Sequence, residues 1–599
     1  MRLTKLKLYF QAIGYSARLI CRSSRLWILV YLLMHLLCST LTLLDTYILK
    51  FLLDDLTGGD LRLQMVFLWV ALYALARVLW RAAKSTEDIL KDSIFQKAQH
   101  RYECEISEKL SRLPLSFLDS SAGKDIVDDV RYTKYTVIHS VQHAMFILVQ
   151  IYTFVLAFGV LARFDLGFSL LFLLLTIPGV LMDEVFDRKA EELRRKTAPD
   201  VRKFSYYRWM LTDAWPAKDV RMYDLTEPIT ARYDEEKQQY IRANKQLGKK
   251  KMLSLMLAEL IRRSGEIGFT VFVVFSAIRG EITLGDVALY TGYALTVSNA
   301  FRDVVWWAVY SYARSTEIIG RVFAFFATPA EEPREGCRAL DGFSSLVFDN
   351  VYFKYPHTEN YVLSGVSFTL HRGDRLSIVG INGSGKSTII KLMLGLYEIE
   401  SGQILLNGYP MSDYDIRDVR RLFSALFQSF VQYPLTLREN VALSDLARAQ
   451  DDAGIERVLT QSGVYEELQP KLQNGLDSFM TRKFADKGTE LSKGQWQKIA
   501  LSRAYFKDAA IIIFDEPSAA LDAEAEDRIF QNFESMSDGK TGIMISHRIS
   551  SARVSNKIIV LDGGRITECG RHDELVAAGG LYAKLYNLQR EKYAAKEVE

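Results

Sequence analysis

The stretch Gly380-Ile381-Asn382-Gly383-Ser384-Gly385-Lys386-Ser387 decides the fold of this chain. It follows the apolar run Leu376–Val379 and leads into Thr388-Ile389-Ile390. The pattern G-x-x-x-x-G-K-[ST] between a strand and a helix is typical of a phosphate loop, in which glycines let the backbone wrap a polyphosphate. The N–H groups at the start of the helix then face the anion. We therefore expect an α/β domain that binds a nucleoside triphosphate.

Side chains in and near this loop supply the other contacts that the nucleotide needs. Lys386 is expected to reach the β- and γ-phosphates, while the Ser387 hydroxyl ligates Mg²⁺. Tyr355, upstream of the loop, either stacks on the base or is a buried core tyrosine. The remaining expected contacts within the motif are Gly380, Asn382, Gly383, Ser384, Gly385 and Thr388.

The whole chain divides into two parts of different composition. Its 599 residues exceed a single domain, and long apolar runs crowd the first 320 residues. The formal net charge of +3 gives no indication of a nucleic-acid partner, and the five cysteines have neither metal-binding nor disulfide spacing. We predict a transmembrane domain over residues 1–320, a linker over 321–345 and a nucleotide-binding domain over 346–599.

Six apolar stretches in the first part are long enough, or nearly so, to cross a bilayer as helices, which takes about 20 residues each. Helices buried in a soluble protein are the alternative, but six such runs in one chain favour an all-α six-helix transmembrane domain. The predicted spans are Leu26–Leu53, Leu63–Arg81, Ser140–Arg163, Leu166–Phe186, Leu253–Ile278 and Val287–Tyr310.

Charge predicts the orientation of these spans. Met1–Arg25 carries six basic residues and no acidic residue. The positive-inside rule therefore places the N-terminus in the cytosol, with this segment as an amphipathic helix along the membrane. The first, third and fifth connections are short, whereas residues 82–139 and 187–252 form long, charged connections with a helical pattern. Helices of about 25 residues there would extend roughly 35–40 Å into the cytosol.

Polar residues within the spans gather on one helical face. Glu259, Arg262, Arg263 and Glu266 have the spacing i, i+3, i+4 and i+7, at which opposite charges can pair. One interpretation is a polar translocation pathway, because charges at membrane depth tend to face water or one another. The other is a set of internal salt bridges that fixes the register of the helices. A second polar group, Arg302 and Asp303, precedes Trp306 and Trp307.

Two carboxylates follow a fully apolar strand in the second part. Ile511–Phe514 precedes Asp515 and Glu516, as in a buried parallel strand that ends beside the phosphate loop. We expect Asp515 to hold Mg²⁺ through water and Glu516 to act as general base on the attacking water. His547 is expected to contact the γ-phosphate, and Gln428 to contact both Mg²⁺ and the nucleophile.

A second candidate phosphate-binding element lies at Leu491-Ser492-Lys493-Gly494-Gln495, directly before a helical segment. One domain has only one γ-phosphate to bind. The economical explanation is a pair of domains, each supplying Ser492, Gly494 and Gln495 to the nucleotide of the other. Nucleotide binding would then join the two domains, and hydrolysis would let them part.

These motifs in this order resemble those of ATP-binding-cassette (ABC) exporters of the type IV fold, in the half-transporter layout, and the resemblance covers essentially the whole chain. It implies ATP and Mg²⁺ as cofactors, adenine stacking for Tyr355 and the Q-loop role for Gln428. It also places the D-loop at Ser518–Asp522 and the acidic X-loop at Asp486–Gly488.

The resemblance further implies two coupling helices, with flanks at Leu113–Asp119 and Ala217–Arg221. The family exchanges helices four and five with the opposite subunit, so the second coupling helix is expected to dock on the partner's nucleotide-binding domain.

Finer features are similar to those of exporters of ribosomally made peptides, the nisin-type lantibiotic exporters among them. General drug and lipid exporters usually carry Arg or Lys where Trp496 stands. The similar segments are Phe427–Tyr433, Leu437–Asn440, Gly494–Leu501 and Asp515–Asp522.

One residue departs from the family pattern, because Lys493 replaces the glycine in the middle of the signature motif. Ser492, Gly494 and Gln495 remain, so contact with ATP should survive. A homodimer that tolerates the lysine is expected. The alternative is a heterodimer, in which this chain keeps Glu516 and the partner carries the degenerate carboxylate site.

The sequence therefore predicts ATP-driven export of a peptide across the bacterial plasma membrane, by a dimer with cytosolic nucleotide-binding domains. An exporter or flippase of lipids, lipid-linked sugars or drugs is the first alternative. An ATP-gated regulatory module or channel is the second.

Overall fold

The computed structural model describes residues 2–58, 63–132, 134–331, 336–356, 358–484, 488–517, 523–535, 540–546 and 549–594. The chain forms two compact units. The first comprises Met1–Ser111 and Asp125–Thr328, and the second comprises Arg112–Lys124 and Pro329–Glu599. The first unit is helical and the second is α/β, as the sequence predicts.

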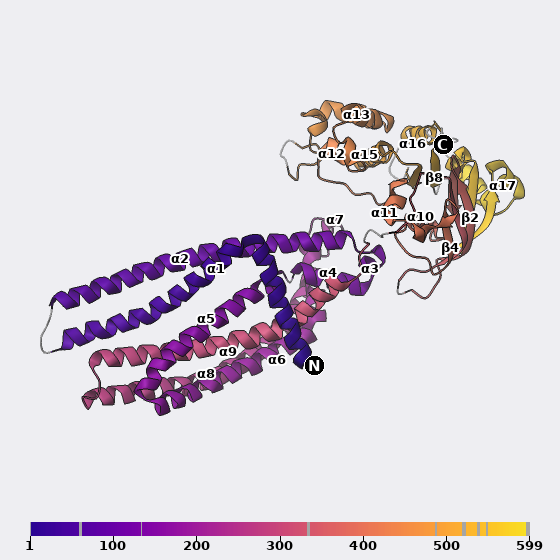
Figure 1. Cartoon of the computed structure of the whole chain (residues 1–599). Helices are drawn as coiled ribbons and strands as arrows, with labels where there is room; N and C mark the ends of the chain where they lie inside the picture. Colours follow the sequence, from indigo (N-terminus) through magenta and orange to yellow (C-terminus); the bar gives the residue numbers. More distant parts are fainter. Residues whose placement is uncertain are drawn as a thin grey trace. The chain divides into compact units, whose positions relative to one another are not determined.

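Six long helices make up most of the described part of the first unit, and each predicted span falls within one of them. Within this unit α1 lies along α2, and α6 lies along α8 (Figure 1). The two short helices α4 (Ser121–Tyr132) and α7 (Ala217–Met222) connect them. The long helices are α1 (Arg2–Thr57), α2 (Leu63–Ser111), α5 (Lys134–Phe164), α6 (Leu166–Thr212), α8 (Thr226–Ile278) and α9 (Leu284–Ala327).

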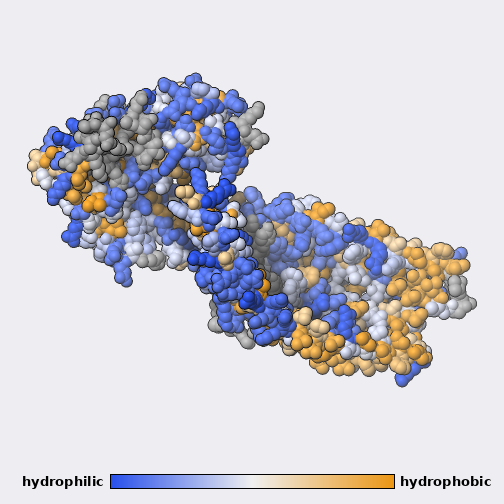
Figure 2. Space-filling view, turned by 180° about the vertical axis from the view of Figure 1, so that it is seen from behind, coloured by the Kyte–Doolittle hydropathy of each residue, from blue (hydrophilic) through white to orange (hydrophobic). Residues whose placement is uncertain are grey.

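The surface of this unit is strongly apolar over part of its length. Hydrophobic residues cover the end that carries the α1–α2 and α8–α9 connections (Figure 2), and many large side chains there are exposed, such as Phe67 and Ile278. Within the described residues, α1, α2 and α5 are long and apolar enough to cross a membrane, and α6 begins with a shorter apolar stretch. Membrane crossing by α8 and α9 stays a prediction.

Capping side chains explain why the connections at this end are so short. Asp165 separates α5 from α6 and accepts a hydrogen bond from the Phe168 N–H at 2.8 Å. Thr283 and Asp286 form a reciprocal capping box at the start of α9. In the N-terminal part, α1 is interrupted at Ser24 by non-helical backbone, which separates the basic segment from the first predicted span.

Two sheets form the framework of the second unit. A four-stranded antiparallel sheet has the order β2-β1-β4-β5, and a six-stranded sheet has the order β10-β9-β3-β8-β7-β6. In the larger sheet, β9, β3, β8, β7 and β6 are parallel, and β10 is antiparallel to β9. The strands are β1 (Ser345–Phe353), β2 (Leu363–His371), β3 (Arg375–Gly380), β4 (Ser401–Leu406), β5 (Tyr409–Pro410), β6 (Phe423–Leu426), β7 (Ile511–Asp515), β8 (Thr541–Ile545), β9 (Lys557–Asp562) and β10 (Arg565–Gly570).

Three helices of the second unit form a layer of their own. A helical layer of α12 (Leu437–Ala442), α13 (Asp452–Gln461) and α15 (Lys493–Phe506) has its own buried core (Figure 1). The helix α3 (Leu115–Asp119) also belongs to this unit, where Leu115 packs against the main core. The remaining helices are α10 (Lys386–Met393), α11 (Ile416–Arg421), α14 (Tyr465–Leu468), α16 (Ala523–Ser535), α17 (His572–Ala578) and α18 (Leu581–Ala594).

Candidate functional site

The predicted phosphate loop runs from the end of β3 to the start of α10. Gly383 and Gly385 have φ values of +80° and +103°, which side chains other than that of glycine rarely adopt. A Cβ on Gly385 would also lie 2.7 Å from the Leu363 side chain. The loop is therefore built for glycine, and it leaves the first N–H groups of α10 without helical partners, as a phosphate-binding helix start requires.

Lys386 lies across this loop. Its side chain is buried, and Nζ donates hydrogen bonds to the carbonyl oxygens of Gly380 and Ile381, both at 2.9 Å. Burial lowers the pKa of the Lys386 ammonium, an effect that the Glu516 and Asp515 carboxylates oppose. Beside it, the buried Ser384 hydroxyl has no hydrogen-bond partner among the described residues. Both groups lie in the loop that the sequence predicts to bind phosphate.

The two predicted carboxylates stand at the end of β7, close to this loop. The Ser387 hydroxyl donates to Asp515 Oδ1 at 3.4 Å, and Gln428 Nε2 donates to Glu516 Oε2 at 2.7 Å. The structure thus brings four of the predicted residues together from three segments of the chain. Hydroxyl, amide and carboxylate oxygens are ligands that Mg²⁺ prefers, so the donor set of Ser387, Gln428 and Asp515 fits that ion.

Glu516 has an unusual backbone conformation that sequence patterns do not predict. Its φ is +54°, in the left-handed region, and its N–H donates to the Ile545 carbonyl oxygen at 2.9 Å. A non-glycine residue there costs of order 1–3 kcal/mol and persists where the surroundings hold it.

Tyr355 lies beside the phosphate-loop helix rather than within the main sheet core. Its hydroxyl is 3.1 Å from the Thr388 hydroxyl, and it accepts a hydrogen bond from Lys391 Nζ at 3.2 Å. Its ring makes edge-on contacts with Phe353 and Tyr397, at centroid distances of 5.1 and 5.3 Å. A half-buried ring next to the loop suits base stacking.

The signature motif begins α15, away from the phosphate loop. Ser492 and Gln495 form a capping box, in which the Ser492 hydroxyl accepts the Gln495 N–H at 3.2 Å and Gln495 Oε1 accepts the Ser492 N–H at 3.0 Å. Gln495 Nε2 also donates to Glu467 at 3.2 Å. Lys493 makes no ion pair or hydrogen bond with any residue that the structure describes. Ser492, Gly494 and Gln495 therefore use α15 and its neighbours, not the phosphate loop of their own chain.

Some predicted residues lie outside the described part of the chain. They include His547, the D-loop Ser518–Asp522, and Asp486 and Lys487 of the X-loop. Conversely, no local sequence signal predicts two sets of contacts near the site. Glu467 binds the signature helix through Gln495 and Lys498, and Asp119 accepts a hydrogen bond from the Tyr397 hydroxyl.

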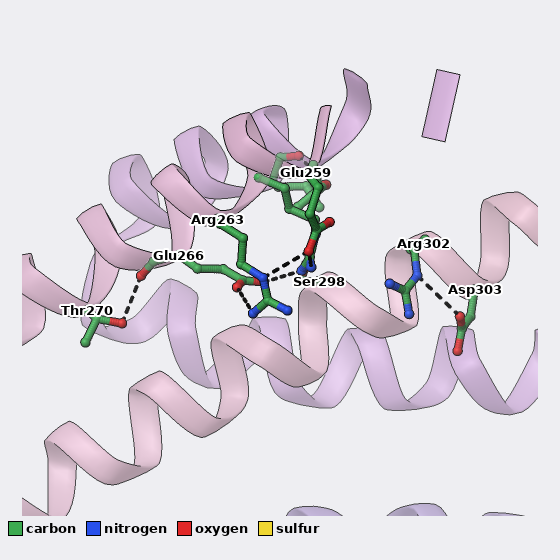
Figure 3. Close-up of polar contacts among 10 residues, drawn as sticks. Glu259, Arg263, Glu266, Thr270, Ser298, Arg302 and Asp303 are labelled. Carbon is green, nitrogen blue, oxygen red and sulfur yellow. Dashed lines mark hydrogen bonds and ion pairs between the residues drawn. The ribbon is translucent and has the colours of Figure 1, made fainter. Parts of the chain in front are cut away.

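The polar face predicted on α8 forms a connected network in the first unit (Figure 3). Arg262 donates to Glu259, Glu266 and, at 3.2 Å, to the Ser298 hydroxyl on α9. Arg263 donates to Glu259 Oε1 at 2.9 Å and to Glu266 Oε2 at 2.8 Å. The ion pairs that the sequence allows are thus present in this network, and both interpretations of their role stay predictions.

The second polar group lies on α9. Arg302 Nε lies 3.8 Å from Asp303 Oδ1, so the two neighbouring side chains form an ion pair (Figure 3).

A triphosphate loop with adjacent carboxylates, joined to a unit of long apolar helices, defines a membrane protein with a nucleotide-hydrolysing domain. Residues 363–519 match the family described as ABC transporter. The subtilin transport ATP-binding protein of Bacillus subtilis is 35% identical over 424 residues, which cover 69% of this chain and 67% of that protein. The chain belongs to the ABC transporter family.

Other similar proteins cover different shares of the chain. The nisin transport ATP-binding protein of Lactococcus lactis subsp. lactis is 26% identical over 580 residues, 95% of each chain. The ATP-dependent lipid A-core flippase of Xanthomonas oryzae pv. oryzae is 33% identical over 384 residues, 63% of each chain. The structure of a bacterial Atm1-family ABC exporter with ATP bound has a TM-score of 0.77 at 24% identity, over 94% of this chain and 98% of that one.

These similarities identify an ABC exporter half-transporter, with an ATP-binding domain whose ATPase activity is coupled to transport. The half-transporter layout implies a dimer. The apolar helices and the exporter relatives indicate a membrane protein.

Proposed function

We propose that this protein exports a peptide of the bacteriocin or lantibiotic type across the bacterial plasma membrane. The observation that carries the proposal is the similarity to the nisin transport ATP-binding protein over 95% of both chains, transmembrane region included. A match that includes the helical unit bears on cargo more than a match confined to the ATP-binding domain does.

Hydrolysis is assigned to the residues around the phosphate loop. Lys386 and the loop N–H groups bind the β- and γ-phosphates, and Tyr355 stacks on adenine. Glu516 accepts the proton of the attacking water, and Gln428 holds that carboxylate in place through its 2.7 Å hydrogen bond. His547 contacts the γ-phosphate. Mg²⁺ held by Ser387, Gln428 and Asp515 would offset the negative charge of the phosphates.

Two copies are proposed to complete the nucleotide sites. Ser492, Gly494 and Gln495 of each copy contact the nucleotide on the other, since they make no contact with the phosphate loop among the described residues of their own chain. We favour a homodimer. Copurification of two differently tagged copies of this chain tests it, and recovery of a single tag bound to another half-transporter would favour the heterodimer.

The membrane topology follows the charge pattern. We place the basic segment Met1–Arg25, the ATP-binding domain and the two long connections in the cytosol.

Transport into inverted membrane vesicles tests the cargo class. With ATP, wild-type vesicles should accumulate a bacteriocin-type precursor peptide, and Glu516→Gln vesicles should not. A fluorescent phospholipid assayed in the same vesicles tests the second candidate, a lipid flippase, which the 33% identity to the lipid A-core flippase favours. ATP-driven lipid movement without peptide uptake would replace the peptide proposal, and ion conductance without hydrolysis would favour a gated channel.

A further inference from the structure

A cavity lies between α8 and α9, next to the charged network of the first unit. It has a volume of about 410 Å³, within the range of small ligand sites. Arg263, Glu266, Thr270 and Thr291 line its polar side, whereas Ile267 and Leu295 are among its apolar walls. The cavity therefore offers one polar side to a ligand that is otherwise apolar.

Arg262 makes the network beside this cavity a fixed frame. Its side chain is only 8% exposed, and its guanidinium donates to both Glu259 and Glu266 and also to Ser298 on α9. Two arginines and two glutamates have no net charge together. An additional charged ligand beside this neutral network would lack a counter-charge, whereas a neutral ligand would need none.

Arg263 is the member of the network that keeps hydrogen-bonding capacity for a ligand. Its side chain is 55% exposed and lines the cavity. Nε and Nη1 each bind one glutamate, and Nη2 makes no hydrogen bond to any described residue. The cavity threonines are already engaged, because Thr270 donates to the Glu266 carbonyl oxygen at 2.8 Å and Thr291 to the Val287 carbonyl oxygen at 2.7 Å.

We propose that this cavity binds an apolar segment of the peptide cargo, with Arg263 donating hydrogen bonds to a neutral carbonyl oxygen of that peptide. The proposal rests on the proposed function, since it names how the same cargo is recognised. The Arg263 Nη2 group can donate hydrogen bonds to an amide carbonyl oxygen of the peptide. That oxygen needs a donor when it leaves water, and it adds no charge to the neutral network. The apolar walls accept a side chain next to that carbonyl.

The test is a binding measurement on the full-length chain in lipid nanodiscs. The probe is a dansyl-labelled leucine–alanine octapeptide blocked as an amide at its C-terminus, followed by fluorescence anisotropy. Arg263→Met should weaken binding about ten-fold or more, because a hydrogen bond from a charged donor is lost. Arg263→Gln keeps an N–H donor and should lose less. Lys250→Met removes a cation from the same helix about 20 Å away and should bind like wild type.

A neutral double variant separates hydrogen bonding from charge balance. Arg263→Met alone leaves one glutamate unbalanced, whereas Glu259→Gln with Arg263→Met keeps the network neutral. The double variant should bind as weakly as Arg263→Met. If it binds like wild type, Arg263 does not donate to the ligand and the proposal is wrong.

Two further probes decide the class of ligand. The same peptide with a free carboxylate, and phosphatidylglycerol as a competitor, compete for the cavity in separate titrations. Binding of the free acid without binding of the blocked peptide, or complete displacement of the bound blocked peptide by phosphatidylglycerol, would overturn the proposal. If wild-type vesicles transport peptide and Arg263→Met vesicles transport it equally, only this site fails. If wild-type vesicles transport no peptide, the proposed function fails first.

Discussion

Replacement of Tyr397 by Phe is expected to loosen α3 from the ATP-binding unit without disturbing nucleotide binding. Tyr397 is buried, its hydroxyl donates to the Asp119 carboxylate at the end of α3, and its ring supports Tyr355. Burial and the Asp119 carboxylate raise the pKa of the Tyr397 phenol, so the hydroxyl stays protonated and remains a donor at neutral pH. Phe keeps the ring and removes only the donor.

The expected magnitude follows from what else holds the segment Arg112–Lys124. A hydrogen bond to a charged group contributes about 1.5–3 kcal/mol, and we take the lower end because Asp119 is largely exposed. Leu115 still packs on the core, and the Glu331 N–H still donates to the Arg112 carbonyl oxygen at 2.7 Å. The variant should therefore open this segment about ten-fold more often without releasing it.

Hydrogen–deuterium exchange of the full-length protein in nanodiscs measures this opening. Amides in residues 115–120 should exchange about ten-fold faster in Tyr397→Phe, while the KM for ATP in basal hydrolysis should change less than about two-fold. Tyr414→Phe is the matched control, because Tyr414 is also buried but donates to the Leu406 carbonyl oxygen at 3.1 Å. Unchanged exchange in Tyr397→Phe, or equal acceleration in Tyr414→Phe, would refute the reasoning.

Three further outcomes are expected. Glu516→Gln should keep ATP binding and slow phosphate release by about 10²–10⁴-fold, and hydrolysis at the wild-type rate would contradict the general-base role. Because burial lowers the pKa of Lys386 below 10.5, ATP affinity should fall as the pH rises through that lowered pKa. Calorimetry at a pH near that lowered pKa, in two buffers of different ionisation enthalpy, should then detect proton uptake on binding, and equal heats would argue against it. Arg262→Met should destabilise the purified protein by about 1.5–3 kcal/mol and more than Arg263→Met, as judged by denaturation, because it removes hydrogen bonds to the buried Glu266 from the more deeply buried of its two arginine partners; equal effects would contradict the frame role.

Local patterns predicted the elements whose formation depends on nearby residues. The phosphate loop, the apolar strand before Asp515 and the six long helices each carry their signal within about 30 consecutive residues. The spacing of Glu259, Arg262, Arg263 and Glu266 likewise placed them on one face. The spacing left two interpretations of these residues open, because it gives no information about Ser298 on α9. The Ser298 hydroxyl accepts a hydrogen bond from Arg262.

Contacts between distant segments were beyond such patterns. Asp119 and Tyr397 are 278 residues apart, and neither belongs to a motif that would pair them. The left-handed backbone of Glu516 depends on the neighbouring strand β8. Glu467 looks like an ordinary surface acid in the sequence, and only the packing of α14 beside α15 reveals that it binds Gln495 and Lys498. Tertiary context determines these features.

The resemblance relates the two short helices α3 and α7 to coupling helices, and they differ in how much of their surface is buried. α3 belongs to the ATP-binding unit of its own chain, where Leu115 packs on the core. α7 belongs to the helical unit; its last residue, Met222, is 78% exposed, and Trp215 and Tyr223 beside it are 78% and 68% exposed. Large apolar side chains gathered on a surface mark a place where another protein binds. A half-transporter works as a dimer, so docking of this exposed surface on a second subunit stays a prediction, whereas α3 packs on the ATP-binding unit of its own chain.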